Sequence, residues 1–186
     1  MDLKSKIILI SGPTASGKSK LALKIAKKKN GEIINADSMQ VYKELKILTA
    51  RPSEIDLKKI EHHLYGFRTV KKDFSSGEWL KLAKKNIKKI RDKNKIQVLD
   101  GGTGLYFKAL TDGLVKIPKM PIHIRNRIRR MQNNLGQKKF YLKLLKIDPS
   151  VKNRIDPTDA QRSIRAYEVI SISKKSIFEW YKKTKP

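Results

Sequence analysis

A glycine-rich segment near the start of the sequence could bind a phosphate group. Residues 12–19 match the pattern of glycine, four residues, then Gly-Lys-Ser/Thr; they are Gly12, Pro13, Thr14, Ala15, Ser16, Gly17, Lys18 and Ser19. Such a loop turns several backbone N–H groups towards one anion, and a helix beginning after it directs its positive end at the same anion. Lys18 would add a positive charge, and the Ser19 hydroxyl could bind Mg²⁺. We predict that this loop binds a diphosphate or the phosphates of a nucleotide such as ATP.

Two further segments carry carboxylates that could act beside this loop. Asp37 lies in the segment Asn-Ala-Asp-Ser-Met-Gln-Val-Tyr of residues 35–42, and it could be a general base, a helix cap or an outer ligand of Mg²⁺. Asp100 ends an apolar run and is followed by Gly-Gly-Thr-Gly, with Thr103 offering a hydroxyl. An apolar strand ending in Asp is typical of the Mg²⁺ site of many phosphate-loop proteins. The alternative for this second segment is an ordinary turn between a strand and a helix.

Two other groups of polar residues are weaker candidates. His62 and His63 are adjacent, so their side chains point in different directions, and structural hydrogen bonding is favoured over a shared metal. Gln161 and Arg165 are four residues apart on a predicted helix and share a face, where they could read a base edge and a phosphate. The alternative for this pair is a solvated helix face.

The elements that would position these residues alternate between strand and helix up to residue 113. Short apolar runs predict strands, and apolar residues at helical spacing predict helices. The predicted strands are Lys6–Ile10, Glu32–Asn35 and Lys95–Leu99, and the predicted helices are Ser19–Lys29, Gly77–Lys93 and Leu105–Leu110. This order favours an α/β fold with a parallel sheet, of the kind found in phosphate-loop NTPases. The carboxyl ends of its strands form the ligand side, where the loop, Asp37 and Asp100 all lie.

The character of the sequence changes after Gly113. Pro118 and Pro121 mark a junction, and only helices are predicted beyond it, over Ile122–Asn134, Gln137–Lys146 and Thr158–Ser171. We therefore predict two domains: an α/β core over residues 1–113 and a basic helical module over residues 114–186.

The composition limits the class of protein and its partners. The 186 residues carry a formal net charge of +27 and no cysteine, which excludes disulfides, thiolate zinc sites and cysteine nucleophiles and is compatible with the reducing cytoplasm. We expect neither a membrane span nor a signal peptide. Residues 114–186 hold 19 basic and 5 acidic residues, including seven of the ten arginines, among them Arg125. This concentration favours a nucleic-acid partner, although much of the lysine excess is explained as well by compositional bias.

These motifs together resemble the tRNA dimethylallyltransferases, also called tRNA isopentenyltransferases. The matching segments are GPTASGKS at 12–19, NADSMQVY at 35–42, TARP at 49–52, HHL at 62–64, GGTGLY at 101–106 and DPTDAQRSIRAYEV at 156–169. They occur in the family's order and cover nearly the whole sequence. The phosphate loop alone is generic, whereas NADSMQVY and GGTGLY together are specific to this family.

The resemblance implies a reaction and roles for particular residues. A dimethylallyl group would move from dimethylallyl diphosphate to the N6 amine of the adenosine beside the anticodon of a tRNA. Asp37 would be the base, with Thr103 and Lys18 as further catalytic residues and Mg²⁺ held by Ser19. The residues that the resemblance places against the tRNA anticodon stem-loop are Asp37, Ser38, Met39, Gln40, Thr103, Arg125, Gln161, Arg162, Ser163, Ile164 and Arg165. We expect a monomer.

Two departures from the family pattern keep alternatives open. Asp100 stands where relatives usually have a small or apolar residue, either as a harmless variant or as an added Mg²⁺ contact. Relatives also continue well beyond Pro186, so we expect a chain truncated at its C-terminus. The alternatives are a small-molecule kinase, which leaves the arginine-rich half unexplained, and a tRNA-binding remnant without catalysis.

Overall fold

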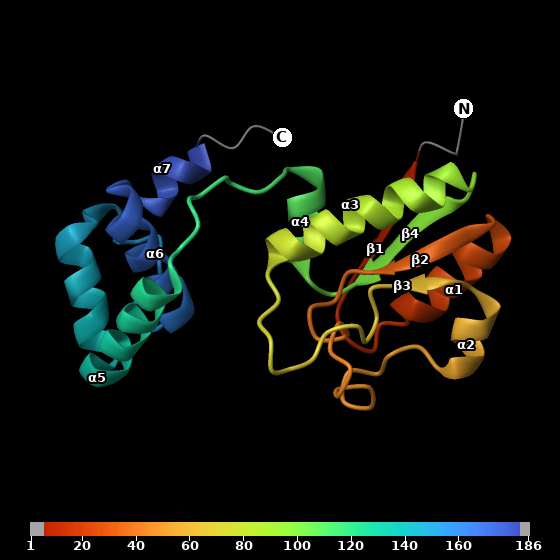
Figure 1. Ribbon diagram of the computed structural model, residues 1–186, viewed down its shortest axis with the longest axis horizontal. Helices are drawn as coiled ribbons and strands as arrows, with labels where there is room; N and C mark the ends of the chain where they lie inside the picture. The colour runs from red at the N-terminus through yellow and green to blue at the C-terminus, as the bar shows by residue number, and fades with distance from the viewer. Residues whose placement is uncertain (1–5, 183–186) are drawn as a thin grey trace. The chain divides into compact units, whose positions relative to one another are not determined.

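The computed structural model describes residues 6–182, which divide into two compact units (Figure 1). The first unit ends at Asp112 and is a parallel sheet flanked by helices; the second begins at Gly113 and is helical. The α/β class predicted from the sequence is confirmed. Among the described residues, there is no helix with the length and apolar character needed to cross a membrane.

The sheet of the first unit has four parallel strands in the order β1-β4-β2-β3. They are β1 (Ile7–Ser11), β4 (Ile96–Gly101), β2 (Gly31–Asn35) and the two-residue β3 (His62–His63). β4 lies between β1 and β2, and it pairs Asp100 with Ile10 on one side and Asn35 on the other. This register brings the ends of β1, β2 and β4 together at one edge, where all three candidate motifs begin.

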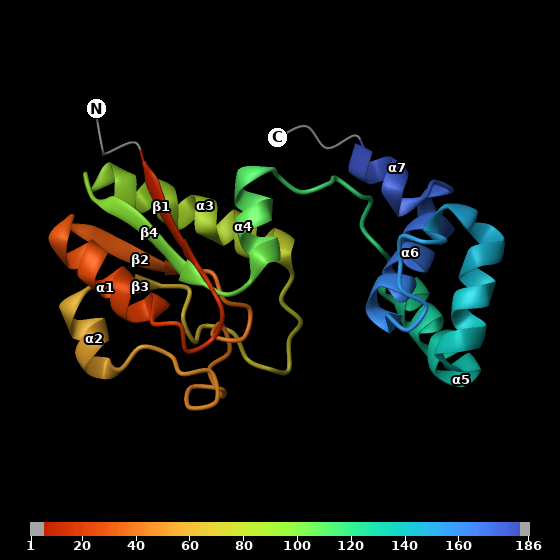
Figure 2. The ribbon, with the colours of Figure 1, turned by 180° about the vertical axis from the view of Figure 1, so that it is seen from behind.

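Helices cover both faces of this sheet, as a parallel sheet requires. Successive strand residues point to opposite faces, so Ile33 and Val98 pack with α1 (Lys18–Lys28), whereas Ile34 and Leu99 pack with α3 (Ser76–Asp92). α4 (Gly104–Thr111) adds Tyr106 to the second cluster. Figures 1 and 2 show the two faces, with α3 in front of the sheet in one view and α1 in front in the other.

The position of α3 follows from its cap and its apolar spacing. The Ser75 hydroxyl accepts a hydrogen bond from the Glu78 N–H, and the Glu78 carboxylate accepts one from the Ser75 N–H, so two N–H groups of the first turn are satisfied. The helix buries one stripe of its surface against the sheet: Trp79, Ala83, Ile87 and Ile90. Trp79 therefore reaches the edge at which the strands end.

The second unit packs its helices around a small apolar core. Its elements are α5 (Ile122–Ile147), the 3₁₀ helix η2 (Pro149–Val151), α6 (Ala160–Ser173) and α7 (Ile177–Lys182). α5 is interrupted at Gly136, whose φ of 72° is not helical, in agreement with the two helices predicted there. The core residues are Tyr141, Leu144, Val151, Ile155, Ala166, Val169 and Ile177.

Four short elements were not predicted from the sequence. They are β3, α7, the 3₁₀ helix η2 and α2 (Glu54–Lys59), none longer than six residues. α2 is too short to give a periodic signal, and its start is fixed by the Ser53 hydroxyl, which accepts a hydrogen bond from the Asp56 N–H. β3 is a strand only because His62 and His63 pair with β2.

A buried carboxylate on β2 predicts how the stability of this unit depends on pH. Burial would raise the pKa of Glu32, but hydrogen bonds from Lys95, Lys93 and His63 outweigh it and lower the pKa from 4.5 to about 2. Because the folded pKa lies below the unfolded one, this stabilisation is complete above about pH 4.5 and is lost as the pH falls towards 2.

We expect Glu32→Gln to lower the melting temperature at pH 7, and we expect this difference from wild type to shrink between pH 4.5 and 2. Thermal melts recorded across that range measure it. Glu54→Gln, which alters an exposed ion pair with Lys46, is the control and should change little. A Glu32→Gln difference that stays constant across the range would contradict the assignment.

Candidate active site

The phosphate loop joins the end of β1 to the start of α1. Gly17, just before the helix, has a φ of 83°, a left-handed conformation that favours glycine. The first turn of α1 carries no acidic residue, so nothing there neutralises the N–H groups that face an incoming anion. The Lys18 ammonium donates a hydrogen bond to the Pro13 carbonyl oxygen and would have to release it to bind a phosphate. The loop thus has the geometry expected of a diphosphate site.

Asp37 follows β2 and is held in place by the buried side chain of Asn35. The Asn35 amide oxygen accepts a hydrogen bond from the Asp37 N–H at 2.9 Å, and its amide nitrogen donates to the Asp37 carbonyl at 2.9 Å. Oδ1 of Asp37 accepts from the Met39 N–H at 2.8 Å, so the carboxylate does cap a local turn. Its other oxygen, Oδ2, accepts no hydrogen bond from within residues 6–182.

Oδ2 of Asp37 lies close to the phosphate loop. A methyl group placed on Gly102 would be 3.5 Å from this oxygen and 3.5 Å from the Gly12 carbonyl oxygen. Asp37 and the phosphate loop therefore both lie next to Gly102, in the glycine-rich turn that follows β4.

Thr103 connects this turn to the Asp37 segment. Its hydroxyl oxygen accepts a hydrogen bond from the Ser38 N–H at 2.9 Å and donates to the Ser38 hydroxyl at 3.2 Å. Its own N–H donates to the Ala36 carbonyl at 3.2 Å. Thr103 thus fixes the backbone of residues 36–38 relative to the start of α4.

Two buried aromatic residues pack against the end of β2. The Trp79 indole N–H donates to the Asn35 carbonyl at 2.8 Å, and the indole stacks on the Tyr106 ring with centroids 4.3 Å apart. Burial raises the pKa of Tyr106 to about 12, so its hydroxyl stays protonated at neutral pH. The sequence analysis placed Trp79 only on a helix face; its link to Asn35 has no signal in the sequence.

Asp100 ends β4 beside the phosphate loop. It is 3% exposed, and its Oδ1 atom has no hydrogen-bond partner within residues 6–182. Burial raises the pKa of its carboxyl group, the Ser19 hydroxyl and the Lys18 charge lower it, and the charge of Asp37 raises it further. A hydroxyl and a buried carboxylate oxygen without a donor are oxygen ligands of the kind that Mg²⁺ prefers, so these residues fit that cation.

The loop after Asp37 folds back on itself. The Gln40 side-chain amide donates to the Thr49 carbonyl at 2.8 Å. The Arg51 guanidinium donates to the Lys43 carbonyl at 3.1 Å and lies directly over Gly66, where a methyl group would overlap it. Met39 stays exposed. Arg51, part of the TARP segment, is therefore an anchor for this loop.

The two adjacent histidines make separate structural contacts. His62 Nδ1 lies 2.7 Å from the Ile60 carbonyl oxygen, and His63 Nε2 lies 2.7 Å from Glu32 Oε2. The structural role predicted for them is confirmed. His63, Glu32 and Glu61 do place potential metal ligands within 4.8 Å of one another. Lys93 and Lys95 already bind these carboxylates, with Nζ–O distances of 2.8–2.9 Å, so the cluster lacks the free negative charge that a cation needs.

In the helical unit, two predicted RNA-facing arginines share one buried carboxylate. Arg165 Nη1 lies 3.1 Å from Glu168 Oε2, and Arg125 Nε lies 3.5 Å from Glu168 Oε1. The side chain of Glu168 is 4% exposed, whereas those of Arg165 and Arg125 are 40% and 32% exposed. Glu168 therefore joins α5 to α6 and holds both guanidinium groups at the surface.

The other α6 residues predicted to contact RNA differ in their solvent exposure. Gln161 and Arg162 are exposed at its first turn, and Ile164 is half-buried. Ser163 is fully buried and accepts a hydrogen bond from the Gln137 amide at 3.2 Å. A side chain in that position packs the helices together, so Ser163 does not belong to an RNA-facing surface.

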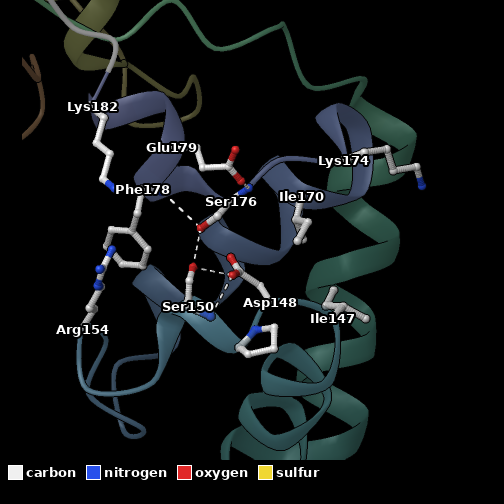
Figure 3. Close-up of a pocket in the computed structure, with 11 residues that line it drawn as sticks. Ile147, Asp148, Ser150, Arg154, Ile170, Lys174, Ser176, Phe178, Glu179 and Lys182 are labelled. Carbon is white, nitrogen blue, oxygen red and sulfur yellow. Dashed lines mark hydrogen bonds between the residues drawn. The ribbon is translucent and has the colours of Figure 1, made fainter.

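This unit also has a cavity of about 380 Å³ at the other end of α6 (Figure 3). The Ser150 hydroxyl bonds both to Asp148, at 2.5 Å, and to the Ser176 hydroxyl, at 2.8 Å, and these contacts tie η2 to the start of α7. Arg154 lies over the Phe178 ring, 5.0 Å from its centroid. Gln161 and Arg165 do not line this cavity.

Comparison with known proteins decides the family. The sequence model of the IPP transferase family matches residues 40–186. The chain belongs to the IPP transferase family. Several of its curated relatives are named tRNA dimethylallyltransferase. The relative from Pelagibacter ubique is 62% identical over 185 residues, covering all of this chain and 59% of its own length; that from Rhizobium rhizogenes is 46% identical, covering 96% and 60%.

Solved structures of IPP transferase relatives are also similar. A eukaryotic dimethylallyltransferase described as acting on tRNA has a TM-score of 0.79 and 28% identity, covering 96% of this chain and 44% of its own. The tRNA isopentenylpyrophosphate transferase of Bacillus halodurans has a TM-score of 0.59 and 34% identity, covering 90% and 56%. The chain spans about 60% of the length of the two curated relatives from Pelagibacter ubique and Rhizobium rhizogenes.

Proposed function

We propose that this IPP transferase family member transfers a dimethylallyl group from dimethylallyl diphosphate to the N6 amine of an adenosine beside the anticodon of a tRNA. The observation that carries the proposal is the position of Asp37. One of its carboxylate oxygens and the phosphate loop both lie next to Gly102. A base close to a diphosphate site is what this transfer needs.

In the proposed reaction, the bond from the allylic carbon to the diphosphate oxygen breaks as the bond from that carbon to N6 forms. N6 is a weak nucleophile because its lone pair is delocalised into the ring, and Oδ2 of Asp37 accepts the proton that N6 loses. The N–H groups at the start of α1 and the Lys18 ammonium would stabilise the charge that develops on the departing diphosphate. Mg²⁺ bound by Ser19 and Asp100 would supply further positive charge there.

Thr103 and the neighbouring segment would position the adenosine. The Thr103 hydroxyl holds Ser38, the residue after Asp37, in place. Met39 is exposed beside it and offers an apolar surface to a base. In single-stranded RNA, an adenosine can leave its stack at modest free-energy cost, so a flipped-out base can enter this site.

The helical unit would bind the anticodon stem-loop. Its proposed contacts are the exposed Gln161 and Arg162 and the partly exposed Ile164, Arg165 and Arg125. The high positive charge of residues 113–182 supports this role, since contacts with phosphates supply much of the affinity for nucleic acids.

The function is tested by incubating the chain with anticodon stem-loop RNA, radiolabelled dimethylallyl diphosphate and MgCl₂. The proposal predicts label in the RNA. RNA binding without transfer would indicate a binding protein that lacks catalysis. Phosphorylation of a small molecule with no label in RNA would indicate a kinase, and either outcome would overturn the proposal.

Substitution of Arg165 would distinguish the proposed RNA site from the proposed diphosphate site. Arg165→Ala should weaken binding of the stem-loop and reduce the slope of log affinity against log salt by about 1, because one phosphate contact is lost. The affinity for dimethylallyl diphosphate should not change. Filter binding at several salt concentrations measures both constants. Arg91→Ala removes an equal charge from an exposed site on α3 and is the control. Equal losses of RNA and diphosphate affinity in Arg165→Ala would count against this assignment.

A further inference from the structure

The cavity of the helical unit contains a buried carboxylate whose hydrogen bonds are incomplete. Asp148 is 3% exposed. Its Oδ1 atom accepts hydrogen bonds from the Ser150 N–H at 3.2 Å and from the Ser150 hydroxyl at 2.5 Å. Its Oδ2 atom is also buried and has no hydrogen-bond partner within residues 6–182. A buried carboxylate oxygen without a donor is unfavourable, so this position favours a ligand that brings a donor.

The inner part of the cavity is polar. Figure 3 shows the Asp148 carboxylate in the middle of the residues that line the cavity, beside Ser150 and Ser176. Ser176 is buried as well, whereas Ile147 and Ile170 add apolar surface to the lining. The volume of about 380 Å³ lies at the lower end of the range of small-ligand sites. The cavity therefore suits one small ligand with a polar end.

The rim of the cavity is positively charged. Arg154, Lys174 and Lys182 line it and are exposed, and none of them forms an ion pair within the part of the chain that the structure describes. The Arg154 guanidinium is held over the Phe178 ring. The Glu179 carboxylate, also at the rim, already accepts a backbone N–H at 3.0 Å. The rim therefore favours an anionic group, and phosphate is the anion that arginine and lysine side chains commonly bind.

We propose that this cavity binds a ribose phosphate unit. A hydroxyl of the sugar donates to Oδ2 of Asp148, and the phosphate lies against Arg154, Lys174 and Lys182. A cationic donor would satisfy Asp148 as well, but the charges at the rim would repel it. The unit can belong to an RNA chain, whose 2′-hydroxyl is a donor, or to a free nucleotide or sugar phosphate. The site does not depend on the proposed transfer reaction and adds a second phosphate site to the chain.

Amide chemical shifts of the ¹⁵N-labelled full chain test this site in separate titrations. Ribose 5-phosphate should shift the signals of Ser150, Ser176 and Glu179. The same shifts on adding anticodon stem-loop RNA would assign the unit to RNA, and their absence with RNA would assign it to a free sugar phosphate or nucleotide. Shifts by ribose 5-phosphate confined to residues 12–19 would overturn the proposal. Inorganic phosphate that binds the cavity as tightly would also overturn it, because the hydroxyl would then contribute nothing.

Two variants test the contacts by their affinity for ribose 5-phosphate. Asp148→Asn keeps an oxygen that accepts from Ser150 but removes the unpartnered acceptor, so the affinity should fall about tenfold or more. Lys174→Gln, which leaves the buried residues unchanged, should weaken binding severalfold. Lys175→Gln is the control, since Lys175 is exposed and does not line the cavity, and it should bind as wild type.

Thermal melts show whether each variant is folded. Asp148→Asn that is folded and binds ribose 5-phosphate as well as wild type would overturn the proposal. Equal losses of affinity in Lys174→Gln and Lys175→Gln would overturn it too, because they would indicate attraction by the net charge and not by the cavity. Failure of the chain to transfer a dimethylallyl group to RNA, with the ribose 5-phosphate shifts intact, would refute only the proposed function.

Discussion

Asp37→Asn should reduce the rate of dimethylallyl transfer by a factor of about 10²–10⁴, the usual contribution of a general base, and leave RNA binding nearly unchanged. The substitution keeps the shape of the side chain. An amide oxygen can still accept the hydrogen bond from the Met39 N–H, and Asn35 still holds the backbone on both sides of residue 37. What is lost is the basicity of Oδ2, the oxygen that faces the phosphate loop across Gly102.

Single-turnover transfer and stem-loop binding, measured on the same protein, test this prediction. Asp73→Asn, an exposed residue of the first unit, is the matched control and should behave as wild type in both. Near-normal transfer by Asp37→Asn would show that another group accepts the proton. A parallel loss of RNA binding would instead indicate that Asp37 acts mainly by contacting the RNA.

Gly101→Ala should destabilise the first unit by about 1–3 kcal/mol, the usual effect of overpacking, and should disturb the site as well. A methyl group on Gly101 would lie 2.1 Å from the Ala36 carbonyl carbon, which is backbone and cannot rotate away. Relief requires β4 to separate from residue 36, and this would break the hydrogen bonds by which Ala36 positions Asp37. We therefore expect stability and transfer to fall together.

Gly104→Ala is the matched control for this substitution. Gly104 is the first residue of α4, and no heavy atom lies within 4 Å of a methyl group placed there. Alanine is a better helix former than glycine, so this variant should be neutral or slightly stabilised. Chemical denaturation of both variants measures the difference. Only Gly101→Ala should thus lower the free energy of unfolding, and a Gly101→Ala variant as stable as wild type would contradict the close approach of β4 to residue 36.

Much of the first unit could be predicted because its signals are local. The apolar runs at Ile7–Ser11 and Ile96–Gly101 are too short for buried helices, and the phosphate loop between a strand and a helix has few structural alternatives. The carboxyl ends of parallel strands meet at one edge, so the proximity of Asp37 and Asp100 also follows from the order of the elements.

The contacts that fix the site could not be predicted in the same way. Trp79 and Asn35 are 44 residues apart, and their hydrogen bond depends on how α3 lies against the sheet. The buried position of Ser163 depends on Gln137, from another helix. Glu168 likewise joins Arg125 and Arg165 from two helices. Such contacts join residues that are distant in the sequence. The motifs therefore identified candidate residues without showing which of their side chains are exposed.

The most direct test of the account is the identity of the modified nucleoside. Anticodon stem-loop RNA treated with this chain, dimethylallyl diphosphate and Mg²⁺ would be digested to nucleosides and analysed by mass spectrometry. The account predicts one adenosine per stem-loop carrying a dimethylallyl group on N6, beside the anticodon, and far less of it after the same incubation with Asp37→Asn. RNA that is bound but contains only unmodified adenosine would contradict it.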